Sequence, residues 1–129
     1  MEESIKKIIE KEGNGKEFDY RGYRCSFKRH PRLLHLCGYV EIPKDHPLYG
    51  MNYDQIEERY NYELPTHGGL TFAGRFGDSN YLIGFDCAHI CDYSPGLGYF
   101  GGDEIYRTAE YVENTIKDMV DFIIEKEVE

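Results

Sequence analysis

The chain has 129 residues and a mass of 15.1 kDa, the length of one domain, so we expect a single domain over residues 1–129. Its content of 40% apolar and 30% charged residues, with 12 Tyr and 7 Phe, excludes a disordered chain. No apolar run approaches the roughly 18 residues of a membrane span, and the start of the chain lacks the pattern of a signal peptide. We therefore expect a cytoplasmic protein with no membrane partner.

The net charge of −9 is unevenly distributed along the chain. Residues 21–32 carry five bases and no acid, whereas residues 103–129 carry nine acids and three bases. An acidic surface repels a polyanion, which argues against a long nucleic acid as the partner. A small phosphorylated ligand bound near residues 21–32 is compatible with this distribution.

The first part of the chain predicts a short helix followed by a β-hairpin. Isoleucines in residues 5–9 recur at helical spacing, and Gly13-Asn14-Gly15 ends that segment. Apolar and polar residues then alternate over residues 23–28 and again over 34–42, which is typical of two strands. The register that keeps one face apolar consists of two pairs, Cys25 with Leu36 and Phe27 with Leu34.

Residues 43–66 show no sustained period, apart from one or two helical turns around Asp54 to Tyr60. Residues 67–73 and 80–87 then predict a second hairpin. Matching the apolar faces gives two pairs, Leu70 with Ile83 and Phe72 with Tyr81. The same register sets two further pairs on the other face, His67 with Asp86 and Gly69 with Gly84. We expect the glycines to form the floor of a shallow hollow beside a His/Asp pair.

The last part of the chain predicts a loop and a long helix. Four glycines between Ser94 and Gly102 indicate a mobile loop. Asp103 is the expected helix N-cap, and apolar residues from Ile105 to Ile123 recur at three- and four-residue steps. The expected fold is therefore α+β: an antiparallel sheet of two β-hairpins, with the amphipathic C-terminal helix and the short N-terminal helix packed on one face.

Candidate reactive groups are dense in residues 86–92, which contain five possible donors: Asp86, Cys87, His89, Cys91 and Asp92. A zinc site commonly takes paired ligand motifs that this segment lacks, so we assign no metal and no cofactor. Cys87 lies on the apolar alternation, where a thiol is inert, and the four cysteines have no C-x-x-C spacing, so we expect neither a nucleophilic thiol nor a disulfide. A His67/Asp86 pair acting in acid–base hydrolysis of a phosphodiester stays open.

The polar residues fit ligand binding better than catalysis, because their side chains match the phosphate, sugar and base groups of a nucleotide. Arg24 and Lys28 would bind phosphate, and Tyr39 and Tyr49 would stack on a base. His67, Thr71 and Asp86 would supply the hydrogen-bond donors and acceptors that complete the pocket. The predicted ligand-binding residues are Arg24, Lys28, Tyr39, Tyr49, His67, Thr71, Asp86 and His89, and no residue is assigned a catalytic role.

Four blocks of sequence resemble a family of small bacteriophage and prophage proteins that has no settled activity. The blocks are CGYV-x-IP at residues 37–43, HPLYG at 46–50, HGGLTF at 67–72 and GFDCAH at 84–89. Cys91 departs from the family pattern, which has Gly there. The resemblance implies a phage origin, and small phage proteins include several that sequester the cyclic-nucleotide or ADP-ribose-like signals of bacterial immunity.

We therefore expect a binding protein, rather than an enzyme, that sequesters a nucleotide-type immune signal in the cytoplasm of an infected bacterium. A homo-oligomer is compatible with so small a chain. One alternative is a hydrolase or phosphodiesterase that uses His67, Asp86 and His89. Another is an inhibitor that presents the acidic C-terminal helix to a host protein. The sequence leaves open the identity of the ligand, whether it is bound or hydrolysed, and the oligomeric state. It also leaves open whether the two hairpins form one sheet and whether residues 86–92 bind a metal.

Overall fold

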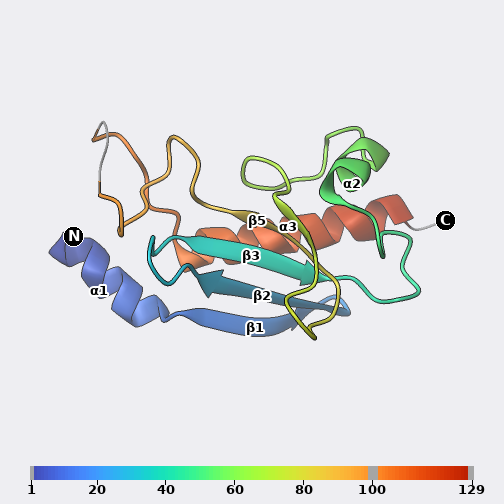
Figure 1. Ribbon diagram of the computed structural model, residues 1–129, viewed down its shortest axis with the longest axis horizontal. Coiled ribbons are helices and arrows are strands. Elements are labelled where there is room, and N and C mark those ends of the chain that lie inside the picture. Colours follow the sequence, from blue (N-terminus) through green and yellow to red (C-terminus); the bar gives the residue numbers. More distant parts are fainter. Residues whose placement is uncertain (1, 99–101, 128–129) are drawn as a thin grey trace.

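The computed structural model describes residues 2–98 and 102–127, which form an α+β fold on one antiparallel sheet (Figure 1). Its strands are β1 (Gly15–Tyr20), β2 (Tyr23–Arg29), β3 (Leu36–Glu41), β4 (Phe72–Gly74) and β5 (Leu82–Asp86). Their order across the sheet is β1-β2-β3-β5-β4, and all neighbours are antiparallel. The two predicted hairpins are thus joined in one sheet by the pairing of β3 with β5.

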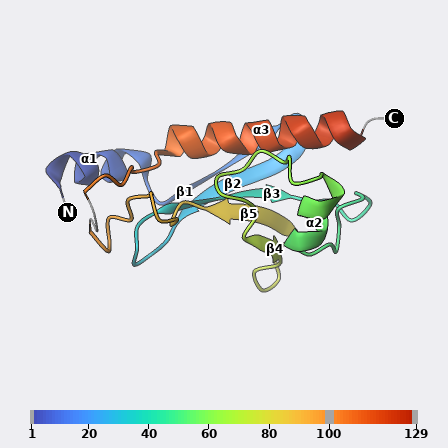
Figure 2. The same ribbon diagram turned by 90° about the horizontal axis from the view of Figure 1, so that it is seen from above.

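Three helices accompany the sheet: α1 (Glu3–Glu12), α2 (Tyr53–Arg59) and α3 (Ala109–Glu127). Figure 2 shows α3 lying along one face of the sheet. Its stripe facing the sheet is fully buried and consists of Val112, Ile116, Met119, Val120 and Ile123. These residues recur at the three- and four-residue steps that the sequence showed, so the predicted α+β class is confirmed, and the helical turns expected in residues 54–60 correspond to α2.

The predicted register of the first hairpin is wrong. Cys25 pairs with Val40 and Phe27 with Gly38, because β3 begins only at Leu36. Residues 30–35 form a longer connection than expected, in which the Leu34 amide donates to the His30 carbonyl. Strand β1 was not predicted at all, because four of its six residues are exposed and its alternation is weak.

The predicted register of the second hairpin is also wrong. Phe72 pairs with Gly84 and Ala73 with Ile83, and β4 contains only three residues. His67 therefore lies in the loop before the sheet, and Asp86 pairs with Cys37 of β3 instead. No hollow forms over Gly84, because the ring of Tyr39 occupies that space.

Helix α3 begins later than predicted. Asp103 does not cap it; instead the Thr108 side chain accepts from the Tyr111 amide at 3.1 Å. The residues before it run extended, and Ile105 forms a parallel bridge with Asp92. That bridge brings the segment after β5 alongside the start of α3. Part of the predicted mobile loop, residues 99–101, lies outside the described residues.

Gly84→Ala tests the close packing at the centre of the sheet. A Cβ at Gly84 would lie 2.5 Å from the Gly38 carbonyl oxygen and 2.5 Å from the Tyr39 ring, so we expect a loss of roughly 1–3 kcal/mol of unfolding free energy. Gly74→Ala, in the neighbouring strand, meets only an ordinary contact of 3.6 Å with Phe72 and is the matched control. Urea unfolding of both variants checks this, and equal stability of the two would contradict it.

Candidate functional site

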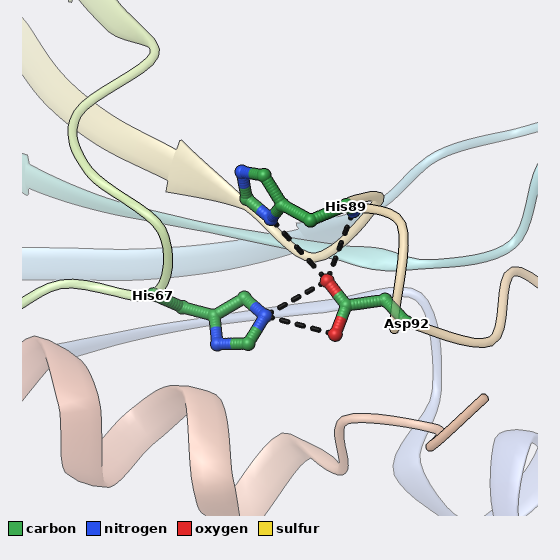
Figure 3. Close-up of side chains that lie close together, drawn as sticks. All are labelled: His67, His89 and Asp92. Atoms are coloured by element: carbon green, nitrogen blue, oxygen red, sulfur yellow. Dashed lines mark hydrogen bonds and ion pairs between the residues drawn. The ribbon is translucent and has the colours of Figure 1, made fainter. Parts of the chain in front are cut away.

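The candidate site lies where three segments meet near the start of α3. His67 comes from the loop between α2 and β4, and His89 and Asp92 come from the turn that follows β5 (Figure 3). One ligand-type atom from each of these three side chains lies within 4.8 Å of the others. We call these three residues the His/Asp centre.

Asp92 is the middle of the His/Asp centre, and its side chain is only 1% exposed. Its carboxylate accepts from His67 Nε2, with 2.8 Å to Oδ2 and 2.9 Å to Oδ1. It also accepts at Oδ2 from the His89 amide at 3.0 Å and lies 3.3 Å from His89 Nδ1. Arg107 Nε donates to Oδ1 at 2.9 Å.

The carboxyl of Asp92 is held in its ionised form. Burial opposes the charge, but the hydrogen bonds from Arg107, the His89 amide and His67 outweigh it and lower the pKa of Asp92 below its usual range. A buried, charged acceptor of this kind fixes the orientation of every donor around it. Asp92 therefore sets the positions of both imidazoles.

His67 is held on both sides, since its Nδ1 lies 2.7 Å from the hydroxyl of Tyr111 on α3. The Arg107 guanidinium lies over the Tyr111 ring, 5.2 Å from the ring centroid. Tyr111, His67 and Asp92 thus form one hydrogen-bonded chain from the helix to the turn after β5. The tautomer of His67 decides which nitrogen donates, so a change of partner at one nitrogen is transmitted to the other.

The two glycines after His67 make the close approach of the two histidines possible. Gly68 and Gly69 have φ of +78° and +94°, in the region that favours glycine. A Cβ at Gly68 would lie 2.7 Å from the His89 ring, so that ring packs directly against the backbone. The loop is fixed further by the Leu70 amide, which donates to Glu57 Oε2 of α2 at 2.9 Å.

The partner predicted for His67 is wrong, because Asp92 takes the place expected for Asp86. With β4 starting at Phe72, His67 is outside the ladder and cannot face Asp86 across it. Asp86 instead lies at the exposed side of the centre, where its Oδ1 is 4.0 Å from His89 Nε2. Of the predicted residues, His67 and His89 therefore belong to the His/Asp centre, and Asp86 lies beside it.

Three other predicted residues, Arg24, Lys28 and Tyr39, share the sheet face opposite α3. Arg24 and Lys28 line a hollow of about 180 Å³, but Arg24 already pairs with Glu17 at 2.6 Å and Asp19 at 3.3 Å. Lys28 lies over the Phe76 ring, and Tyr39 packs edge-on against both Phe72 and Phe76. This group is separate from the His/Asp centre.

Tyr49 and Thr71 belong to neither group. Tyr49 lines a second hollow of about 360 Å³, where its hydroxyl accepts from Arg75 and its ring contacts Tyr81. The side chain of Thr71 is exposed, and its amide donates to the Gly84 carbonyl at 2.9 Å. The eight predicted residues therefore do not form one pocket.

Two residues of the site, Arg107 and Tyr111, were missed by the sequence. Tyr111 lies in the first turn of α3, whereas Arg107 lies in the segment before the helix, two residues before its first residue. No helical spacing therefore links the two residues, and neither residue type indicates a partner on the turn after β5.

The cysteine and acidic-helix alternatives gain no support from the geometry. All four cysteines are free, and burial raises the pKa of the Cys87 thiol, which disfavours a nucleophilic thiolate. Three acids of α3 are engaged within the chain: Glu113 with Lys16, Asp121 with Arg21, and Glu127 with Arg59.

Within the described residues, no helix has the length and apolar character needed to cross a membrane. The chain was also compared with known proteins. No protein family, no curated protein and no solved structure matches it.

Proposed function

We propose that the protein is a hydrolase that cleaves a phosphate ester of a small molecule at the His/Asp centre. The observation that carries the proposal is one buried, ionised carboxylate, Asp92, that holds two imidazoles at 2.8–3.3 Å beside the half-buried side chain of Asp86. Titratable groups gathered in this way are more frequent at reactive sites than in ordinary cores.

Arg107 supports a phosphate group as the part of the substrate that binds here. Its Nε is used by Asp92, and its side chain is 23% exposed, so the outer N–H groups of the guanidinium can face a bound anion. His89, with 34% of its side chain exposed, lies on the same accessible side as Asp86. A phosphate bound there would place its phosphorus beside the His/Asp centre.

The reaction is a simple hydrolysis and needs no redox partner. The oxygen of a water molecule forms a bond to phosphorus, and the bond from phosphorus to the ester oxygen breaks. The water loses one proton, and the leaving oxygen gains one. Asp86 is the carboxylate nearest to the exposed side of His89, which suits it to take the proton from the water.

A second candidate function is sequestration of a nucleotide-type signal without catalysis, by a protein of phage origin. The observation that favours it is the hollow of about 180 Å³ lined by Arg24 and Lys28, next to the exposed aromatic side chain of Phe76. Two cationic side chains beside an aromatic ring suit the binding of a phosphate group and the stacking of a base. The acids Glu17 and Glu41 line the same hollow and oppose an anion there.

One experiment separates the two functions. The purified chain is mixed with cyclic dinucleotides, cyclic trinucleotides, cyclic ADP-ribose isomers and bis(4-nitrophenyl) phosphate, binding is followed by thermal shift, and the heated supernatant is analysed by mass-resolved chromatography. The proposal expects a cleaved product from at least one compound, lost in His89→Ala and kept in Arg24→Ala. A stabilising compound recovered intact, with binding lost in Arg24→Ala, would instead establish sequestration.

A panel with neither product nor thermal shift would contradict both functions for this class of ligand. Cleavage that is equal in the original chain and His89→Ala would also contradict the hydrolase proposal, because it would come from a contaminant or from another site.

A further inference from the structure

We infer that His67, His89 and Asp92 form a binding site for one divalent transition-metal ion, and that Zn²⁺ is the ion best matched to it. The inference deepens the proposed function, because the ion would activate the attacking water, but binding can be tested without any substrate. Two imidazoles and one carboxylate from two separate segments converge here. This ligand set suits zinc and related ions, whereas Ca²⁺ and Mg²⁺ prefer sites made of oxygen ligands.

The distances between the three side chains are close to those that a bound ion requires. Zn²⁺ binds nitrogen and carboxylate oxygen at about 2.0–2.2 Å, which puts neighbouring ligand atoms of a tetrahedron roughly 3.3 Å apart. His89 Nδ1 lies 3.3 Å from Asp92 Oδ2, and His67 Nε2 lies 2.8 Å from the same oxygen. Admission of the ion would widen the distance between His67 Nε2 and Asp92 Oδ2 by about half an ångström, and all three ligand atoms already lie within 4.8 Å of one another.

The outer contacts of these side chains also match a metal site. With Nε2 bound to the ion, Nδ1 of His67 carries its proton and donates to the Tyr111 hydroxyl, 2.7 Å away. Arg107 donates to Oδ1 of Asp92, and Oδ2, which accepts from the His89 amide at 3.0 Å, has a second lone pair for the ion. Such outer partners fix the tautomer and the orientation of the ligands, and their loss typically weakens metal binding about 10–100-fold.

The burial of the three residues predicts an open fourth position. The side chain of Asp92 is 1% exposed and that of His67 13%, whereas His89 is 34% exposed. The ion would therefore be accessible from the side of His89, where Asp86 also lies. Three protein ligands with one open position are the pattern of catalytic zinc sites, and structural sites are closed by a fourth protein ligand.

The test uses the whole chain, freed of metal with a chelator and titrated with Zn²⁺ by calorimetry and with Co²⁺ by visible absorption. We expect one ion per chain and a tetrahedral Co²⁺ spectrum. His89→Ala should weaken binding at least 10-fold without unfolding the chain, because His89 is the most exposed of the three ligands. Tyr111→Phe keeps all three ligands and should weaken binding about 10-fold through the orientation of His67.

His30→Ala is the matched control. The His30 ring stacks on the His35 ring with 5.1 Å between the ring centroids, and these two residues form the other close histidine pair in the described residues. The His30→Ala variant should bind metal as the original chain does. The inference is overturned if no ion binds at one per chain, if His89→Ala binds unchanged, or if His30→Ala abolishes binding. Metal binding without cleavage of any ester would contradict the hydrolase alone. Cleavage that persists in metal-free protein would contradict the role of the ion in activating water, whereas the titrations alone decide whether the site binds metal.

Discussion

Asp92→Asn is expected to lower the turnover of a phosphate ester at least about 100-fold and to weaken metal binding by a similar factor. The reason is that, among the residues that the structure describes, Asp92 is the one carboxylate in contact with both His67 and His89. Asn keeps the shape but replaces one acceptor oxygen with an NH₂ group, which cannot accept from a donor or bind a metal ion. It also removes the charge that Arg107 faces at 2.9 Å.

The same substitution should reduce the unfolding free energy by roughly 1–3 kcal/mol, since donors that bonded to a buried carboxylate lose a charged partner. Asp118→Asn, on the exposed side of α3, is the control for the loss of one negative charge and should retain turnover, metal binding and stability. Turnover is measured on folded protein, verified by circular dichroism. Full activity of Asp92→Asn would place the reactive centre elsewhere in the chain.

The sequence was sufficient to predict the elements with strong periodicity. Helix α3 has apolar residues at regular helical steps from Val112 to Ile123, and this stripe leaves few alternatives to an amphipathic helix on a sheet. Alternation likewise identified β2, β3 and β5. Strand β1 was not predicted because its side chains mostly face solvent, so apolar and polar residues alternate only weakly in its sequence.

Register was not predictable, because it depends on the length of the connections. The first hairpin turns through residues 30–35, with Leu34 at a φ of +67°, a conformation that no Gly or Asn marks in the sequence. The predicted pairs, Cys25 with Leu36 and Phe27 with Leu34, require a shorter connection, so every predicted pair of this hairpin is shifted. The wrong register had little effect on which face of the sheet each side chain of this hairpin was assigned to. Alternation alone assigns Cys25 and Cys37 to opposite faces.

The candidate site was predictable only in part. The dense donors in residues 86–92 and the His67-Gly68-Gly69 sequence both pointed to the region of the His/Asp centre. The pairing of His67 with Asp92 joins two loops, and loops have no period from which a partner could be read. It also depends on the bridge between Asp92 and Ile105, which carries Arg107 and Tyr111 to the same place.

Substitution of Arg29 is expected to reduce the unfolding free energy more than substitution of any other arginine of the sheet. Its side chain is 1% exposed and its guanidinium makes five hydrogen bonds, so all of its N–H groups are used. They reach the Gly13 carbonyl and Glu12 at the end of α1, the Leu34 carbonyl in the turn after β2, and the Tyr106 hydroxyl before α3. One buried cation therefore connects three segments that lie far apart in the sequence.

Arg29→Leu should cost about 3–5 kcal/mol of unfolding free energy, because it removes the ion-pair partner of the largely buried Glu12 carboxylate and the donor to three other acceptors. That is a large part of the 5–15 kcal/mol that stabilises an ordinary domain, and it corresponds to a melting temperature roughly 10–20 °C lower.

Arg24→Leu is the matched control, since Arg24 lies on the same strand and is also ion-paired, with Glu17 and Asp19, but its side chain is 46% exposed. Solvent screens that pair, so we expect little change in melting temperature. Both variants are compared by thermal unfolding and by hydrogen exchange. Arg29→Leu should raise exchange at residues 30–35 and at the end of α1. If both arginine variants melted at the same temperature, burial of the Arg29 guanidinium would not be the source of its effect.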